Sequence, residues 1–375
     1  MKLTINHSLI VLLILIGVIH SEVHNVCDIC TCDHLEAPMI VHCDGKNLTT
    51  LSDIMFNSTI EVLSLNNNSL TFKSVADLDK INNITSLKTL TLSNNPLSSI
   101  PELSLSNLTD LQLENTSLNN ATFPKSYLNC TNLQSIILSN NKLMKITSND
   151  LKVLSSLTDL KIDNAELTSI EFDTFINISQ NLRSISFESN SLDSAKFLLP
   201  IRNLRSINFD KNHFKQLPIE IIKMNQTKHF LFRDNQISVI NESSPLSFWA
   251  KTNLSDIEIY LNNNPFDCCE SRWFIRYLSE SKNLIKDSMN LTCALPKAYT
   301  GKRLVDLRVE SMDCSTDPFH PSKAHISKLA ILIASLFSIV VFIVIVAGAT
   351  IYRRNQVYVR NRRGYQQIHG VNADA

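Results

Sequence analysis

The 375-residue chain lacks the short motifs that position catalytic groups in common enzyme classes. It has no glycine-rich phosphate loop, and only six of its residues are glycine. It has neither the His-Glu-x-x-His sequence of zinc hydrolases nor a Gly-x-Ser-x-Gly nucleophile turn. Its 35 basic residues balance its 35 acidic residues, so bulk charge predicts no polyanionic partner. These absences argue against an enzyme, a cofactor and a nucleic-acid ligand.

The chain does contain one pattern, Leu-x-x-Leu-x-Leu-x-x-Asn-x-Leu, in nine copies. The clearest copies are residues 87–97 and 133–143. The first positions are Ile60, Leu87, Leu108, Leu133, Leu157, Leu182, Leu204, Thr227 and Asp256, so the steps run from 21 to 29 residues. Apolar residues that alternate in twos indicate strands rather than helices. The pattern predicts a leucine-rich-repeat solenoid, an α/β fold rich in β structure, whose stacked coils form a curved parallel sheet.

The asparagine at the ninth position follows each strand, where its amide can bond backbone groups of the adjacent coil. It is present as Asn68, Asn95, Asn141, Asn190, Asn212, Asn235 and Asn264. Thr116 and Ala165 replace it in two copies. Threonine can still make one such bond but alanine cannot, so we expect a local irregularity at Ala165.

Two apolar segments predict the topology of the chain. Residues 1–21 combine Lys2, an apolar run and Ser21, which is typical of a cleaved secretory signal peptide. Residues 329–351 carry no charge and are long enough to cross a bilayer as one helix. Arginines follow this segment, and positive charge stays cytoplasmic. The sequence predicts a single-pass type I protein of the plasma membrane, with its N-terminus outside the cell.

Nine cysteines and many glycan acceptors fit an extracellular location. In a secreted segment, cysteines before and after the repeats predict disulfides. A zinc site at Cys27-x-x-Cys30, near His34 and His42, is the alternative on spacing alone. Cys130 stands where other copies have leucine or isoleucine, so we expect a buried small apolar residue; a reactive thiol is the alternative.

Asn-x-Ser/Thr acceptors predict heavy N-glycosylation, which leaves sugar-free surface as the place where a partner docks. The thirteen acceptors are Asn47, Asn57, Asn67, Asn83, Asn107, Asn115, Asn120, Asn129, Asn177, Asn225, Asn241, Asn253 and Asn290.

The cysteine clusters carry a resemblance to a known family. Cys27-x-x-Cys30-x-Cys32 followed by Cys43 resembles the N-terminal cap of extracellular leucine-rich-repeat proteins. Residues 264–269, with Trp273, Phe274, Cys293 and Cys314, resemble the C-terminal cap, although the family there has Cys-x-Cys instead of adjacent cysteines. The resemblance implies the pairs Cys27–Cys32, Cys30–Cys43, Cys268–Cys293 and Cys269–Cys314. We expect Trp273 and Phe274 to lie in the core of this cap; an exposed aromatic contact is the alternative.

The ectodomain is similar to those of Toll-like receptors, neuronal adhesion receptors and insect transmembrane repeat proteins. Only about two dozen residues are predicted inside the cell, so the cytoplasmic signalling domain of Toll-like receptors is absent from this sequence. The expected organisation is a signal peptide (1–21), N-terminal cap (22–43), repeats (44–264), C-terminal cap (265–314), stalk (315–328), membrane helix (329–351) and tail (352–375).

Outward-pointing residues of the strands line the concave side, the usual binding surface of a solenoid. The central strands carry an acidic series with few basic neighbours, chiefly Lys161: Asp110, Glu114, Asp159, Asp163, Glu188 and Asp210. We expect a basic protein surface to dock there by complementary charge, with Ile137 as an apolar contact. A solvated acidic face, with Ile137 an ordinary exposed apolar residue, is the alternative.

These features predict a cell-surface glycoprotein that binds an extracellular protein ligand or a neighbouring receptor, as an adhesion molecule, co-receptor or capture receptor. A structural surface-coat glycoprotein and an innate-immune recognition subunit are alternatives. Tyr365 and Ile368 form a Tyr-x-x-apolar segment in the tail, which resembles the signals that endocytic adaptors bind. The sequence identifies neither the ligand nor the oligomeric state.

Overall fold

The computed structural model describes residues 23–33, 39–252, 256–280, 284–315, 337, 341–342 and 344–352. The predicted signal peptide, Asn253, nearly all of the stalk and the tail segment with Tyr365 and Ile368 lie outside these ranges, as does part of the predicted membrane helix. The chain divides into two compact units, Met1–Met312 and Asp313–Ala375. Each unit is described by itself.

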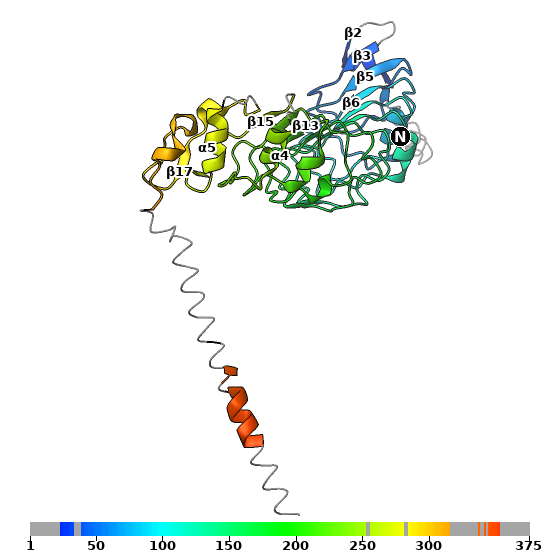
Figure 1. The fold of residues 1–375 in the computed structure, drawn as a ribbon. Helices are drawn as coiled ribbons and strands as arrows, with labels where there is room; N and C mark the ends of the chain where they lie inside the picture. Colours follow the sequence, from blue (N-terminus) through cyan, green and yellow to red (C-terminus); the bar gives the residue numbers. More distant parts are fainter. Residues whose placement is uncertain are drawn as a thin grey trace, which may run out of the picture. The chain divides into compact units, whose positions relative to one another are not determined.

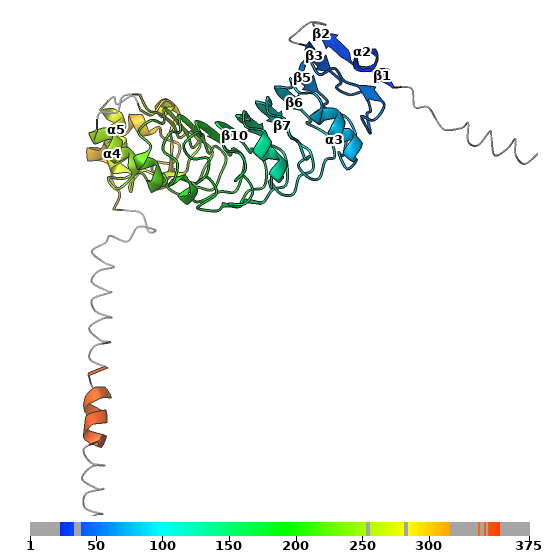
Figure 2. The ribbon, with the colours of Figure 1, turned by 90° about the vertical axis from the view of Figure 1, so that its right-hand side faces the viewer.

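The first unit is a leucine-rich-repeat solenoid, as the repeat pattern predicts. Its described residues form an 11-stranded sheet in the order β15-β14-β13-β12-β10-β8-β7-β6-β5-β3-β2. Each of the nine copies supplies one parallel strand: β5 (Ile60–Ser64), β6 (Thr89–Thr91), β7 (Asp110–Gln112), β8 (Ser135–Ile137), β10 (Asp159–Lys161), β12 (Ser184–Ser186), β13 (Ser206–Asn208), β14 (His229–Leu231) and β15 (Glu258–Tyr260). The strands lie side by side along the inner side of the curved repeat unit (Figures 1 and 2).

Short segments return the chain on the other side of the coils. They are β4 (Ile54–Met55), α3 (Val75–Asn82), η1 (Lys125–Asn129), β9 (Lys145–Ile146), β11 (Ser169–Ile170), η2 (Lys196–Leu198), η3 (Ile219–Lys223) and α4 (Pro245–Lys251). At the N-terminal end, β1 (His24–Asn25) pairs with β4, and β2 (Thr31–Asp33) pairs antiparallel with β3 (Met39–His42). At the C-terminal end lie β16 (Phe266–Asp267), α5 (Arg272–Ser279), η4 (Ser288–Asn290), β17 (Cys293–Leu295), η5 (Leu304–Asp306) and η6 (Val309–Ser311).

Alternation along each strand places the core inside the coils. Leu90 and Leu92 are fully buried. Thr89 and Thr91, which alternate with them and point to the outer face of the sheet, are half-buried. In later copies phenylalanine replaces the leucine at the sixth position, so Phe187 stacks on Phe209, and Phe209 packs tilted against Phe232. Phe175, Phe197 and Phe214 extend this cluster, with ring centroids 5.0–6.4 Å apart. Each such buried side chain stabilises the stack by about 1.5–3 kcal/mol relative to exposure.

The ninth-position asparagines join successive coils, as the sequence predicts. Asn141 is buried, and its Nδ2 donates to the carbonyl oxygens of Leu113 (2.8 Å) and Leu138 (2.9 Å). Its Oδ1 accepts from the backbone amides of Thr116 (2.9 Å) and Leu118 (3.0 Å). The other six asparagines repeat the Oδ1 contact to the coil before them. The ladder satisfies backbone groups that burial would otherwise leave unpaired.

The predicted irregularity at Ala165 is present, and a similar one accompanies Thr116. The Leu143 amide, which has no side-chain acceptor, donates instead to the backbone carbonyl of Ala165 at 3.1 Å. Met144 then takes a positive φ of 58°, and Ser98, facing Thr116, does the same. The Thr116 hydroxyl donates to the Leu113 carbonyl at 2.8 Å, so threonine makes one of the usual bonds.

The eighth position of every copy adopts the left-handed conformation. Its residues are Asn67, Asn94, Asn115, Asn140, Asn164, Ser189, Lys211, Asp234 and Asn263, with φ between 50° and 59°. Asparagine and aspartate tolerate this region better than most residues other than glycine. A chain with six glycines therefore turns out of its strands mostly on asparagine.

Ser189 tests the importance of this backbone conformation. Its φ is 56°, so Ser189→Val forces a β-branched residue into the left-handed region, whereas Ser189→Gly does not. We expect the valine variant to be less stable than the glycine variant by roughly 1–2 kcal/mol in urea unfolding. Equal unfolding midpoints would contradict the assignment of strain to this position.

The second unit contributes helical residues at 337, 341–342 and 344–352. Apolar side chains in these positions, including Phe342 and Val344, are exposed. No helix within the described residues is both long and apolar enough to cross a membrane. The predicted span of 329–351 lies partly outside the described residues and stays a prediction.

Candidate binding face

The strand face consists of the side chains at the third, fifth and seventh positions of the nine copies. The third and fifth positions lie on the strands, and the seventh follows each strand. In-register parallel pairing brings equivalent positions of neighbouring copies together, for example Asp159 beside Ser135 and Ser184. All eight predicted binding residues lie on this one surface.

On the C-terminal part of the strand face, the predicted acidic residues have basic partners, and of these only Lys161 was expected from the sequence. Asp210 is buried and receives Arg233 Nε at 2.7 Å. Glu188 Oε1 lies 2.8 Å from Lys211 Nζ. Asp163 is 3.4 Å from Lys161 and also accepts from the Ser186 hydroxyl at 2.6 Å. The expectation of few basic neighbours is therefore wrong for this part of the face.

The Glu188–Lys211 and Asp210–Arg233 pairs differ in the direction in which the protein shifts the pKa of the carboxyl group. Hydrogen bonding from Lys211 lowers the pKa of Glu188. Burial raises the pKa of Asp210, and this effect exceeds the opposing contact with Arg233. The hydrogen bond to Asp210 in turn raises the pKa of Arg233. These contacts hold coils together, so they offer a partner less free charge than the sequence suggests.

Three acidic residues remain without a basic partner among the described residues: Asp110, Glu114 and Asp159. The Asp110 and Asp159 carboxylates each accept from the preceding threonine hydroxyl at 2.6 Å. Glu114 accepts from Asn140 Nδ2 at 2.6 Å. These are neutral donors, so the three negative charges are left for solvent or a ligand. Ile137 lies in the strand between β7 and β10 and is half-buried.

At the C-terminal end of the face, Tyr260 and Glu258 lie among basic residues. The Arg233 guanidinium sits 5.5 Å from the centre of the Tyr260 ring. Glu258 contacts His229 at 3.0 Å and Lys286 at 3.7 Å. The alternation of strand residues predicts that Tyr260, His229 and Glu258 lie on this face. It does not predict the contact between Glu258 and Lys286, because Lys286 belongs to the C-terminal cap.

The glycan acceptors avoid the strand face. All twelve that the structure describes are exposed, and none is at the third, fifth or seventh position of a copy. Six lie one to five residues before a copy begins, on the strand-entry edge: Asn57, Asn83, Asn107, Asn129, Asn177 and Asn225. Asn67 and Asn115 border the face at the eighth position of early copies. Along strands β8 to β15, neither the strand face nor the edge where the chain leaves the strands carries a glycan acceptor.

Several exposed apolar side chains lie directly beside acceptors. Leu128, Ile176 and Met289 are 61%, 52% and 59% exposed, and each precedes an acceptor asparagine. A glycan at the next residue would shield such a side chain from other proteins. We therefore do not assign these positions to a partner surface.

The caps contain disulfides where the resemblance implies them. Cys27–Cys32, Cys30–Cys43 and Cys268–Cys293 are bonded. Cys269 and Cys314 are also disulfide-bonded. The sulfurs of Cys27 and Cys30 are therefore not thiolates, which excludes the alternative zinc site. Phe274 is buried as expected, but Trp273 is only half-buried.

Cys130 is a free, buried cysteine, as its place in the repeat predicts. Its Sγ accepts from the Leu105 amide at 3.3 Å, and burial raises the pKa of its thiol. A raised pKa disfavours the reactive thiolate. This cysteine therefore acts as part of the core.

Comparison with known proteins agrees with this architecture. No protein-family model matches the chain. Over 114 residues it is 27% identical to mouse trophoblast glycoprotein, covering 29% of this chain and 26% of that protein. The chain is similar to trophoblast glycoprotein. The rat trophoblast glycoprotein is 27% identical over 105 residues, covering 27% of this chain and 24% of the relative. The chain thus aligns with about a quarter of the length of these curated relatives.

The crystal structure of human trophoblast glycoprotein, 5T4, has the same fold. It superimposes with a TM-score of 0.52 at 20% identity, over 76% of this chain and 98% of that one. At this identity the likeness shows the fold alone. With the capped solenoid already described, it confirms the resemblance to extracellular leucine-rich-repeat proteins.

Proposed function

We propose that the chain is a glycosylated, single-pass cell-surface protein whose strand face binds an extracellular protein ligand or a neighbouring receptor. The distribution of acceptors carries this proposal, because it leaves the strand face free of sugar while the strand-entry edge is lined by it. A surface-coat glycoprotein has no need for one bare face. The similarity to trophoblast glycoprotein supports the glycoprotein part of the proposal.

The chemistry of the face favours a basic partner. Asp110, Glu114 and Asp159 lie on the coils of β7 and β10, on either side of the coil that carries Ile137, and have no basic partner among the described residues; Gln112 and Lys161 are the residues paired with Ile137 itself. A cationic surface with one apolar side chain would match both features, since complementary charge speeds encounter and an apolar contact holds the complex. The protein would then work as an adhesion molecule, co-receptor or capture receptor, with adaptors bound at Tyr365 and Ile368.

A triple substitution tests the role of these charges. Asp110→Asn, Glu114→Gln and Asp159→Asn together remove three negative charges while keeping side-chain size and hydrogen-bonding oxygens. We expect partner binding to weaken by roughly tenfold or more at low ionic strength, because each contact is worth up to about 1 kcal/mol. Proximity labelling on intact cells identifies the partner, and a binding titration with the full-length protein measures the change.

The matched control neutralises three carboxylates away from the strand face, by Asp173→Asn, Asp193→Asn and Glu220→Gln. This variant should label and bind the same partner as the unchanged protein. If both variants bind equally well at low salt, the acidic part of the strand face is not the binding surface.

A further inference from the structure

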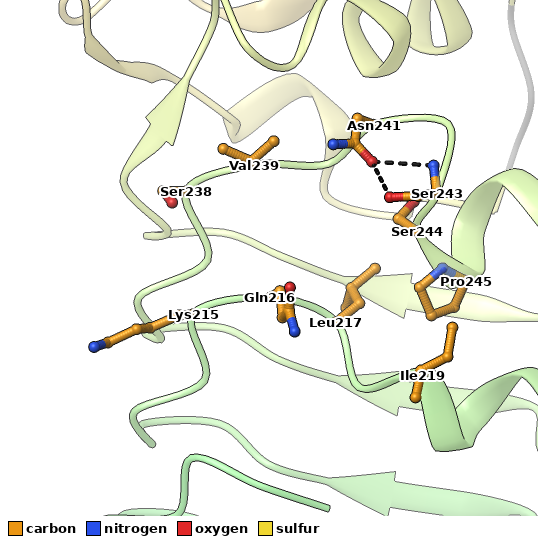
Figure 3. Close-up of a pocket in the computed structure, with 10 residues that line it drawn as sticks. All are labelled: Lys215, Gln216, Leu217, Ile219, Ser238, Val239, Asn241, Ser243, Ser244 and Pro245. Carbon is orange, nitrogen blue, oxygen red and sulfur yellow. Dashed lines mark hydrogen bonds between the residues drawn. The ribbon is translucent and has the colours of Figure 1, made fainter. Parts of the chain in front are cut away.

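A pocket of about 380 Å³ opens between two successive coils, in the segments that follow β13 and β14 (Figure 3). One wall comes from residues 215–219 and the other from residues 238–245. Ligand pockets in proteins begin at about 300 Å³, so this one suits a small molecule or one or two sugar rings rather than a protein segment.

An acceptor asparagine forms part of the pocket wall. Asn241, in the sequence Asn241-Glu242-Ser243, is exposed and lines the pocket. Its Oδ1 accepts from the Ser243 amide at 3.0 Å and from the Ser243 hydroxyl at 2.6 Å. The amide nitrogen, the atom to which a glycan is attached, points away from Ser243 (Figure 3). A sugar at this atom begins at the rim of the pocket.

The lining combines apolar and polar groups in the way a sugar ring requires. Ile219 is 59% exposed and faces Pro245 across the opening (Figure 3). Gln216 and Ser238 add hydrogen-bonding side chains. The Ser244 hydroxyl oxygen is buried. Gln216, which is exposed, and Ser238, which is half-buried, are therefore the polar side chains that a sugar can reach.

We propose that the first N-acetylglucosamine of a glycan on Asn241 folds back into this pocket. The ring lies against Ile219 and Pro245, and a polar group of the sugar bonds the Gln216 side chain. The glycan then bridges the coils of β13 and β14 and acts as part of the folded protein, whereas the other glycans extend into solvent. This inference needs Asn241 to be glycosylated but is independent of ligand binding at the strand face.

Release of glycans from the folded, full-length protein tests the proposal. Peptide-N-glycosidase is added without denaturant, and mass spectrometry follows each site with time. We expect the Asn241 glycan to be released roughly tenfold or more slowly than the Asn225 glycan, because its sugar must first leave the pocket. An unoccupied Asn241, or equal release at the two sites, would overturn the proposal.

Two variants separate pocket binding from other causes of slow release. Ile219→Ser and Gln216→Ala leave the acceptor sequence intact but weaken the pocket, so both should accelerate release at Asn241 and leave release at Asn225 unchanged. Slow release that persists in both pocket variants would show that the pocket does not hold the sugar.

Discussion

Asn141→Ala should lower the free energy of unfolding by about 3–5 kcal/mol. The side chain is buried and joins the coils of β7 and β8 through the amides of Thr116 and Leu118 and the carbonyl of Leu113. Alanine removes these bonds and leaves two buried amide groups without an acceptor, at about 1–3 kcal/mol each. Urea unfolding followed by circular dichroism measures the loss.

Asn119→Ala is the matched control. Asn119 is exposed in the preceding coil, which follows β7, and bonds only the neighbouring Asn120 side chain among the described contacts. We expect a change of about 0.5 kcal/mol or less. If Asn141→Ala costs no more than this control, the asparagine ladder does not hold the coils together.

Loss of the Cys268–Cys293 disulfide should have the next largest effect. The bond closes a loop with a sequence separation of 25 residues and links β16 to β17 in the C-terminal cap. Cross-linking a loop of this length stabilises the folded state by about 3–4 kcal/mol through the entropy of the unfolded chain. We therefore expect the double variant Cys268→Ala and Cys293→Ala to unfold at lower urea and to be secreted poorly.

Cys130→Ala provides the comparison, since Cys130 is buried but not bonded to another cysteine. Its removal should cost about 1 kcal/mol, for a small cavity and a weak contact to Leu105. It should leave mobility on a non-reducing gel unchanged. A double variant as stable as Cys130→Ala would show that the cap does not depend on this bond.

The repeat period predicted the strands well because burial repeats along the chain at the same spacing as the structure. Even the last copies, where Thr227 and Asp256 replace leucine, keep the register: β14 and β15 pair residue by residue. The irregularity at Ala165 was also predictable, because it follows from the absence of one side-chain group.

The charge of the candidate face was less predictable, since it depends on contacts between coils. Lys211 occupies the eighth position, which the alternation of strand residues does not place on the face, yet its left-handed backbone brings it to Glu188. Arg233 pairs with Asp210 from the next coil, 23 residues away. The pocket beside Asn241 was equally hidden, because its walls come from irregular segments that no period describes.

The two breaks in the asparagine ladder divide the stack into blocks. The backbone amides of Leu97 and Leu143 donate to backbone carbonyl oxygens instead of to an asparagine side chain of the next coil. Backbone hydrogen bonds such as Ser98 N to the Thr116 carbonyl still cross these junctions, but the amide hydrogen bonds of a ninth-position asparagine are missing from them. We therefore expect local opening to begin at these two junctions rather than in the phenylalanine-filled coils that follow them.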